Sequence, residues 1–221
     1  MKSYQRLLTV GSLAAFLLAS TGLSYAQNLL ELARIGTPQQ VQAALDGGAK
    51  VNARGKNGVT PLILAALFNP DSNVIRVLLK AGAQLEETTS DGRTPLLLAA
   101  QFNQNPDVIS ALLEAAAPNG NENLETQEAL RLAAESNPNP EVIATLVKAG
   151  AQINDRGSDG RTPLMIAAAF NPNPNVISFL LDAGADGRLT SREGKTAFDY
   201  GSENTKLKGT QEYLELKLSQ Q

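Results

Sequence analysis

The chain repeats itself at a fixed interval of 34 residues. The repeated opening motif stands at Thr60-Pro61-Leu62, Thr94-Pro95-Leu96, Glu128-Ala129-Leu130, Thr162-Pro163-Leu164 and Thr196-Ala197-Phe198. A second motif keeps the same register at Val74-Ile75, Val108-Ile109, Val142-Ile143 and Val176-Ile177. Repetition at this period predicts a stack of supersecondary units that contact only their neighbours, and it argues against one closed core.

Each unit is predicted to contain two short helices. In the unit that begins near residue 160, Thr162 can cap a first helix and Pro163 can occupy its first position, where no N–H is needed. Asn171 follows this helix, and asparagine tolerates the left-handed conformation that ends many helices. The second helix carries one apolar stripe, formed here by Val176, Ile177, Leu180 and Leu181. Gly184 then ends the unit.

These motifs resemble the ankyrin repeat. The matching stretches are Gly47–Leu62, Gly92–Ala100, Val108–Leu113, Gly160–Ala168 and Val176–Asp186. The resemblance implies an all-α ankyrin-repeat solenoid of helix–turn–helix units with short β-hairpin-like loops, here called tips. It also implies a non-catalytic role in binding proteins through the tips and the exposed side of the first helices.

Two features depart from the family pattern. The usual period is about 33 residues, and the extra residue lies between the two helices, at Pro70, Gln104, Pro138 and Pro172. The histidine that the family places after Thr-Pro-Leu is replaced by Ile63, Leu97, Arg131 and Met165. We therefore expect the side-chain hydrogen bond of that histidine to be absent.

The first 26 residues have the pattern of a secretory signal peptide. A short basic start precedes the apolar run Leu7–Ala19, and small residues stand at Ser24 and Ala26. The apolar run of about 13 residues is short of the roughly 20 that span a bilayer. We expect cleavage after Ala26 and export of a periplasmic or secreted protein that keeps no membrane attachment.

Residues 27–221 are expected to form the repeat domain. Its predicted parts are an N-terminal half repeat at 28–57, repeats at 58–90, 91–125, 126–158 and 159–192, and a C-terminal cap at 193–221. The cap is polar, as the end of a stack must be, and Thr210–Leu218 is expected to supply its last helix. The unit near Pro118–Leu132 has lost the Gly-x-Thr-Pro motif, and three explanations stay open: a recognition site, a bend in the stack or neutral drift.

The composition narrows the possible functions. The chain contains no histidine and no cysteine, which excludes a Ser–His–Asp triad, a thiol nucleophile and a zinc–thiolate site. Its 22 acidic and 19 basic residues give a net charge of −3, whereas a nucleic-acid partner usually requires a basic surface. No glycine-rich phosphate motif is present. We expect no enzyme activity, cofactor, metal or nucleic-acid partner.

The candidate binding residues lie at the tips, which are expected at 51–59, 85–93, 119–127, 153–161 and 188–195. Clustered basic side chains there can bind carboxylates of an acidic partner, although a solvated surface of mixed charge would show the same pattern. The predicted partner-binding residues are Arg54, Lys56, Arg93, Arg156, Arg161, Arg188 and Arg192.

Three further patterns have structural explanations that we prefer. Aromatic residues recur at Phe68, Phe102 and Phe170, with Ser136 interrupting them; they could form an exposed ladder, but we expect each ring to pack over the longer inter-helix loop. The asparagine column at Asn69, Asn103, Asn137 and Asn171 is expected to serve helix ends rather than a ligand. The stretch 155–160 is only faintly like a calcium loop, and we expect a turn.

The sequence therefore predicts a monomeric, non-catalytic protein-binding module in a bacterial periplasm. A narrower version is that it binds one enzyme there and protects or inhibits it. The alternative is a secreted effector that binds a protein of a host or competitor cell.

Overall fold

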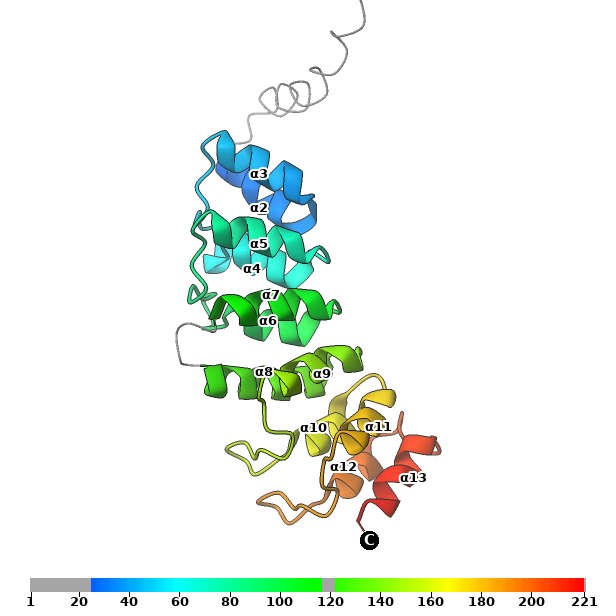
Figure 1. Cartoon of the computed structure of the whole chain (residues 1–221). Helices are drawn as coiled ribbons and strands as arrows, with labels where there is room; N and C mark the ends of the chain where they lie inside the picture. The colour runs from blue at the N-terminus through cyan, green and yellow to red at the C-terminus, as the bar shows by residue number, and fades with distance from the viewer. Residues whose placement is uncertain (1–24, 117–121, 221) are drawn as a thin grey trace, which may run out of the picture.

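The computed structural model describes residues 25–116 and 122–220, and every regular element in these ranges is helical (Figure 1). The predicted signal peptide lies almost entirely outside the described residues, so its cleavage stays a prediction. Within the described ranges, no helix is both long enough and apolar enough to cross a membrane.

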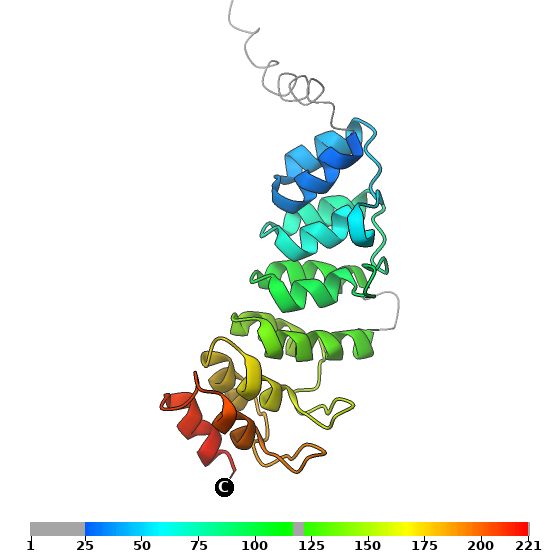
Figure 2. The ribbon, with the colours of Figure 1, turned by 180° about the vertical axis from the view of Figure 1, so that it is seen from behind.

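Each unit contributes a first and a second helix, and the pairs stack in chain order (Figures 1 and 2). The first helices are α2 (Tyr25–Ile35), α4 (Pro61–Phe68), α6 (Pro95–Phe102), α8 (Glu122–Ser136), α10 (Pro163–Phe170) and α12 (Ala197–Glu203). The second helices are α3 (Pro38–Asp46), α5 (Ser72–Lys80), α7 (Pro106–Ala116), α9 (Pro140–Lys148), α11 (Asn175–Asp182) and α13 (Gln211–Leu218). Each first helix packs against the first helix of the next unit, which confirms the predicted all-α solenoid.

The first helices begin where the threonine caps predicted. The hydroxyl oxygens of Thr60, Thr94, Thr162 and Thr196 each accept the backbone N–H three residues later, at 3.3–3.4 Å. The alanine columns on these helices are buried; Ala65, Ala99, Ala133 and Ala167 have no exposed surface. Such small side chains let neighbouring first helices pack closely.

Glycines end most of the second helices. Gly48, Gly82, Gly150 and Gly184 have φ values of 91°, 90°, 102° and 95°, a left-handed conformation that glycine adopts without steric cost. In the unit of α6 and α7 this column holds Ala116, and α7 runs on to that residue instead of ending at the position of Lys80 or Lys148.

The asparagine column is buried and connects the units. The side-chain amides of Asn69, Asn103, Asn137 and Asn171 each donate to two backbone carbonyls at the end of the preceding first helix, at 2.8–3.0 Å. Each side-chain oxygen accepts the backbone N–H two residues later. The helix-end role is confirmed. The prediction that these asparagines adopt a left-handed conformation is wrong. The φ values of Asn69, Asn103 and Asn171 are −85°, −84° and −61°.

A second asparagine explains the extra residue of the repeat. The amides of Asn105, Asn139 and Asn173 donate to the backbone carbonyls of Pro70, Gln104 and Pro138, which are the inserted residues of the preceding units. The side-chain oxygens of the same asparagines accept N–H groups in the first turn of the second helix. The insertion thus supplies the acceptor for a second line of hydrogen bonds between units.

The degenerate unit has a long helix where the others have a tip. Four tips close with the same backbone hydrogen bond, from Gly55 to Val59, Thr89 to Arg93, Gly157 to Arg161 and Ser191 to Lys195. In the third unit α8 begins at Glu122, about two turns before the position at which Pro61 and Pro95 start their helices. Helix α8 therefore replaces most of the third tip (Figure 1).

The two ends of the stack also differ from the middle. The segment expected to be a half repeat contains both helices of a unit, α2 and α3, because Gly36 takes the place of the asparagine and the capping residue Thr37 follows it directly. At the other end α13 supplies the last helix as predicted, and the Thr210 side chain caps it. The outer side of α13 is less polar than expected, since Leu214 and Leu218 are 52% and 62% exposed.

The asparagine ladder generates a stability prediction. In Asn137→Ala, the carbonyls of Ala100 and Asn103 and the N–H of Asn139 lose their partner in a fully buried site. Each group left unsatisfied costs about 1–3 kcal/mol, so urea unfolding should show a clear loss of stability. The control Asn175→Ala removes an exposed asparagine and should stay within about 0.5 kcal/mol of wild type. Equal stabilities would contradict the role assigned to Asn137.

The second-helix stripe gives a second prediction. Leu180 has no exposed surface, and Leu180→Ala should cost roughly 2–5 kcal/mol because it leaves a cavity between units. Leu214→Ala truncates a half-exposed leucine and should cost much less. Thermal melting followed by circular dichroism measures both. A Leu180→Ala variant that melts like wild type would show that this stripe does not hold the stack together.

Candidate functional site

An exposed apolar column runs along the ends of the first helices. Ile35, Phe68, Phe102 and Phe170 are 64%, 51%, 53% and 56% exposed. Each is the last residue of its first helix. We call this column the apolar ladder and the surface that carries it the first-helix face.

The asparagine hydrogen bonds fix the register of the ladder. Each ladder residue precedes the residue whose carbonyl accepts the next unit's asparagine, as Ile35 precedes Gly36 and Phe68 precedes Asn69. By the same bonds, Ser136 is the rung between Phe102 and Phe170. Ile35 and Phe68 are 33 residues apart, whereas the later rungs are 34 residues apart. The 34-residue period of the sequence therefore did not identify Ile35 as a member of the column.

The expectation that each ring packs over the inter-helix loop is corrected by these exposures. Packed helices lie about 8–10 Å apart, whereas aromatic rings contact each other at centroid separations of about 4.5–7 Å. Rings on successive first helices are therefore too far apart to cover one another. The sole close contact of a ring in the ladder with a charged group, among the described residues, is the Arg34 guanidinium, 5.7 Å from the centroid of Phe68.

The structure pairs four of the predicted binding residues with acidic neighbours. Arg54 contacts Glu87 of the next tip, and Arg93 lies 3.3 Å from Asp91. The Arg188 guanidinium binds Asp186 through two hydrogen bonds of 2.9 and 3.1 Å and thereby lowers the pKa of that carboxyl. Arg161, the fourth, contacts Asp159 and Glu193.

Arg161 also has a structural role in the stack. Its Nε donates to the Tyr200 hydroxyl at 3.1 Å, and its guanidinium carbon lies 4.6 Å from the Tyr200 ring centroid. Tyr200 is buried and donates in turn to Ser191 at 3.0 Å. These contacts join the fourth unit to the C-terminal cap, so a loss of binding in an Arg161 variant would not by itself identify a contact.

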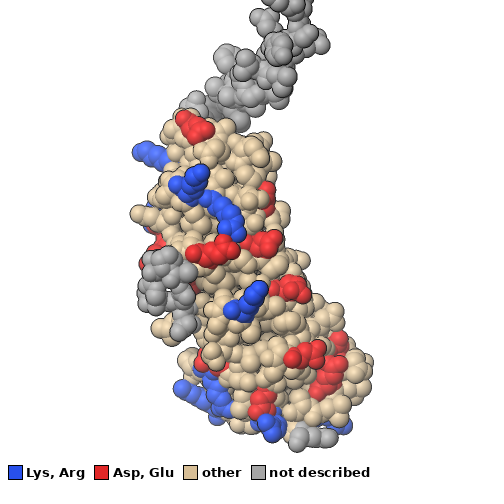
Figure 3. All heavy atoms as spheres, viewed as in Figure 1, with Lys and Arg blue, Asp and Glu red and all other residues tan. Residues whose placement is uncertain are grey.

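The other three predicted residues, Lys56, Arg156 and Arg192, have exposed side chains. None of them has an ion pair with another described residue. Figure 3 shows basic atoms gathered at the lower left of the molecule, where the fourth and fifth tips lie in Figure 1. Of the seven predicted binding residues, these three are the ones most available to a partner, because they are exposed and unpaired among the described residues.

The tips reach over the first-helix face. Arg93 Nη1 donates to Gln101, which stands next to the ladder residue Phe102, and Gln101 donates to the rung Ser136 at 3.4 Å. At the end of the stack, Lys195 Nζ donates to Glu203 at 2.8 Å. The tips and the apolar ladder are therefore parts of one continuous surface.

Arg131, in the column of the missing histidine, makes the connection that the sequence did not predict. Its Nη1 donates to the backbone carbonyl of Arg161 at 3.2 Å, and its Nη2 lies 3.8 Å from Asp159. Its guanidinium lies so close to Gly157 that a Cβ there would be 1.7 Å from Nη1. The column has no histidine, and at Arg131 a different side chain supplies a hydrogen bond to the next unit.

The stretch 155–160 forms a turn, as predicted. Gly160 N–H donates to Gly157 at 2.9 Å, and Asp159 accepts the backbone N–H of Arg161 at 3.0 Å. Burial acts to raise the pKa of Asp159, but that hydrogen bond and the nearby Arg131 and Arg161 guanidinium groups outweigh it and hold the pKa below its usual value. Among the described residues, no cluster of three acidic side chains is arranged to hold a metal ion.

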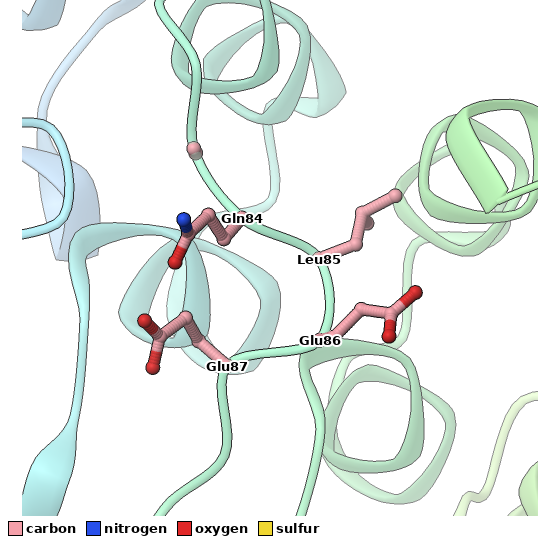
Figure 4. Close-up of a pocket in the computed structure, with 5 residues that line it drawn as sticks. Gln84, Leu85, Glu86 and Glu87 are labelled. Carbon is pink, nitrogen blue, oxygen red and sulfur yellow. The ribbon is translucent and has the colours of Figure 1, made fainter.

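A hollow lies beside the second tip (Figure 4). It has a volume of about 600 Å³ and is lined by Ala83, Gln84, Leu85, Glu86 and Glu87. Figure 4 shows Leu85 and Glu86 pointing to one side of this loop and Gln84 and Glu87 to the other. Since consecutive residues of one loop line it and it is open to solvent, the hollow is a surface feature and does not resemble an enclosed small-molecule site.

Comparison with known protein families agrees with the fold. The family model of ankyrin repeats in three copies matches residues 29–127 and 130–216. The chain belongs to the ankyrin-repeat family, whose members are generally non-catalytic modules that bind other proteins. A search of curated protein sequences found no match.

Several solved structures share the fold of this chain. The human ASB11 ankyrin repeat domain has a TM-score of 0.70 at 25% identity, over 95% of this chain and 93% of that one. A chain from the complex of the predatory endopeptidase Bd0816 with the immunity protein Bd3460, of Bdellovibrio bacteriovorus, has a TM-score of 0.67 at 25% identity, over 87% and 97%. The ankyrin repeat protein EF0377 shares the fold, with a TM-score of 0.66 at 24% identity, over 89% and 98%.

The contact between Arg131 and Gly157 gives a testable coupling. Gly157→Ala should displace the guanidinium and break its hydrogen bond to Arg161, at a cost of about 0.5–1.5 kcal/mol. In an Arg131→Ala background the same change should cost little, because the obstructing group is gone. Urea unfolding of the four proteins gives the coupling energy. Strictly additive effects would show that Arg131 does not occupy this position in solution.

Proposed function

We propose that this protein is exported and binds one enzyme in the periplasm through its first-helix face, protecting the cell by inhibiting that enzyme. The observation that carries the proposal is the exposed apolar ladder beside basic tips. Clusters of exposed aromatic side chains on a folded surface mark protein-binding sites. The membership of the chain in the ankyrin-repeat family supports a protein as the ligand.

A structural neighbour supports an enzyme as the partner. This neighbour comes from a complex of an immunity protein with an endopeptidase. The alignment with our chain covers 97% of the length of the neighbour chain. Inhibition by a stack of repeats requires only that the stack cover the entrance of an active site. The extended face of a solenoid is suited to this, because it presents many contacts over a long, rigid surface.

Export is supported by the amino-terminal sequence. The basic start, the apolar run Leu7–Ala19 and the small residues that end at Ala26 form the three parts of a signal peptide. An exported inhibitor would meet an enzyme that acts outside the cytoplasm, for example on the cell wall or on envelope proteins.

In-cell crosslinking of the tagged chain, followed by mass spectrometry, tests the proposal. Two variants are compared with wild type: a ladder variant with Phe68→Ser, Phe102→Ser and Phe170→Ser, and a tip variant with Lys56→Ser, Arg156→Ser and Arg192→Ser. We expect one enzyme to be captured by wild type and lost with the ladder variant, since truncation of central aromatic residues removes most interface energy. Purified wild type should inhibit that enzyme. The tip variant should associate with it more slowly than wild type, and its binding should depend less on salt concentration.

Other results would contradict the proposal. A captured partner that the ladder variant retains would move the site away from the first-helix face. A chain that accumulates in the medium and captures nothing from the producing cell would favour the secreted effector. Circular dichroism of both variants serves as the control, because all six side chains are exposed and their loss should leave the fold intact.

A further inference from the structure

We propose that the apolar ladder binds an amphipathic helix of the partner, with one apolar side chain every seven residues. This inference rests on the proposed function and specifies the chemistry of the bound segment. It follows from the spacing of the rungs and from their exposure.

The spacing of the rungs matches a helix better than a strand. Neighbouring first helices pack in direct contact, which places successive rungs about 8–10 Å apart. Seven residues of an α-helix rise about 10.5 Å and return the side chain close to the same face. In a strand, side chains on one face repeat at about 6.6 or 13 Å, so a strand falls out of register with the ladder after one step.

The gaps between rungs suit the insertion of side chains. Phe68 and Phe102 are each about half exposed, and successive rings are too far apart to stack. An apolar side chain of the partner can pack between two rungs, in the manner of knobs that pack into holes, where it displaces exposed groups such as the Arg34 guanidinium beside Phe68. Five rungs from Ile35 to Phe170, with Ser136 among them, correspond to about four heptads of a bound helix.

The charges beside the ladder leave the charge of the bound helix open. The position before the start of the first-helix motif holds Val59, Arg93, Gln127, Arg161 or Lys195. Its three cations are paired within the chain, Arg93 with Asp91, Arg161 with Asp159 and Glu193, and Lys195 with Glu193 and Glu203. The polar rung Ser136 favours a polar side chain at the matching heptad.

Site-specific photo-crosslinking tests the spacing directly. Benzoylphenylalanine replaces Phe68, Phe102 or Phe170, one at a time, in the full chain expressed in its own cell, and mass spectrometry locates the crosslinked residues of the partner. A bound helix predicts that the sites reached from Phe68 and Phe102 lie about seven residues apart, and those from Phe102 and Phe170 about fourteen. The same photoreactive group at Leu214, which is exposed on α13, is the control and should give no partner.

The outcomes separate this inference from the proposed function. Sites about three and six residues apart would identify an extended segment, and sites in unrelated segments would identify a composite surface; either result overturns the helix. A partner captured by chemical crosslinking but reached from no rung overturns the ladder as its site and leaves the partner itself established. A chain that captures no partner by either method overturns both.

Affinity measurements supply a second readout on the identified partner. Phe102→Ser should weaken binding about tenfold or more, because it removes a central aromatic rung. Phe102→Leu keeps an apolar rung and should weaken it less. The control Leu214→Ser changes an exposed leucine away from the ladder and should bind like wild type. Equal affinities for Phe102→Ser and wild type would overturn the inference.

Discussion

The buried asparagine amide between successive units is the interaction on which the rest of the structure depends. At Asn137, for example, one side chain donates to two carbonyls of the preceding unit and accepts an N–H of its own. A helix end buried between units would otherwise leave those carbonyls without a donor. The same bonds recur at every junction from Asn69 to Asn171, and the final junction uses Asn204. They fix the register of each unit on the next, and therefore the alignment of everything on the surface.

Much of this architecture was predictable because it is local. The capping threonines, the glycines that end second helices and the apolar stripes all follow from chemistry within a few residues. The exposed ladder was considered from the sequence but not preferred, since the sequence does not reveal that rings such as Phe102 would lie too far from their neighbours to be covered. The contact of Arg131 was not predicted for a similar reason. Its hydrogen-bond partner, the carbonyl of Arg161, lies 30 residues away in the sequence. The sequence likewise contained no signal that pairs Arg54 with Glu87.

The site follows from the same periodicity as the fold. A stack in strict register turns one exposed side chain per unit into a line, and the tips add a parallel line of charges. The structure also reduces the set of tip residues that can act, because Arg161 supports the junction with Tyr200 while Lys56, Arg156 and Arg192 extend into solvent. The loss of the third tip to α8 divides the remaining tips into two linked pairs, joined by the backbone hydrogen bonds from Ser90 to Asn57 and from Arg192 to Asp159.

The most direct test of the central claim, that a protein partner covers the first-helix face, is hydroxyl-radical footprinting of the chain alone and in complex with its captured partner. The rings of Phe68, Phe102 and Phe170 should oxidise readily in the free chain, because each is about half exposed. All three should be protected in the complex, while Leu214 and Leu218 should oxidise equally in both. Protection confined to the second helices or to α13, with the three rings oxidised as before, would contradict the claim.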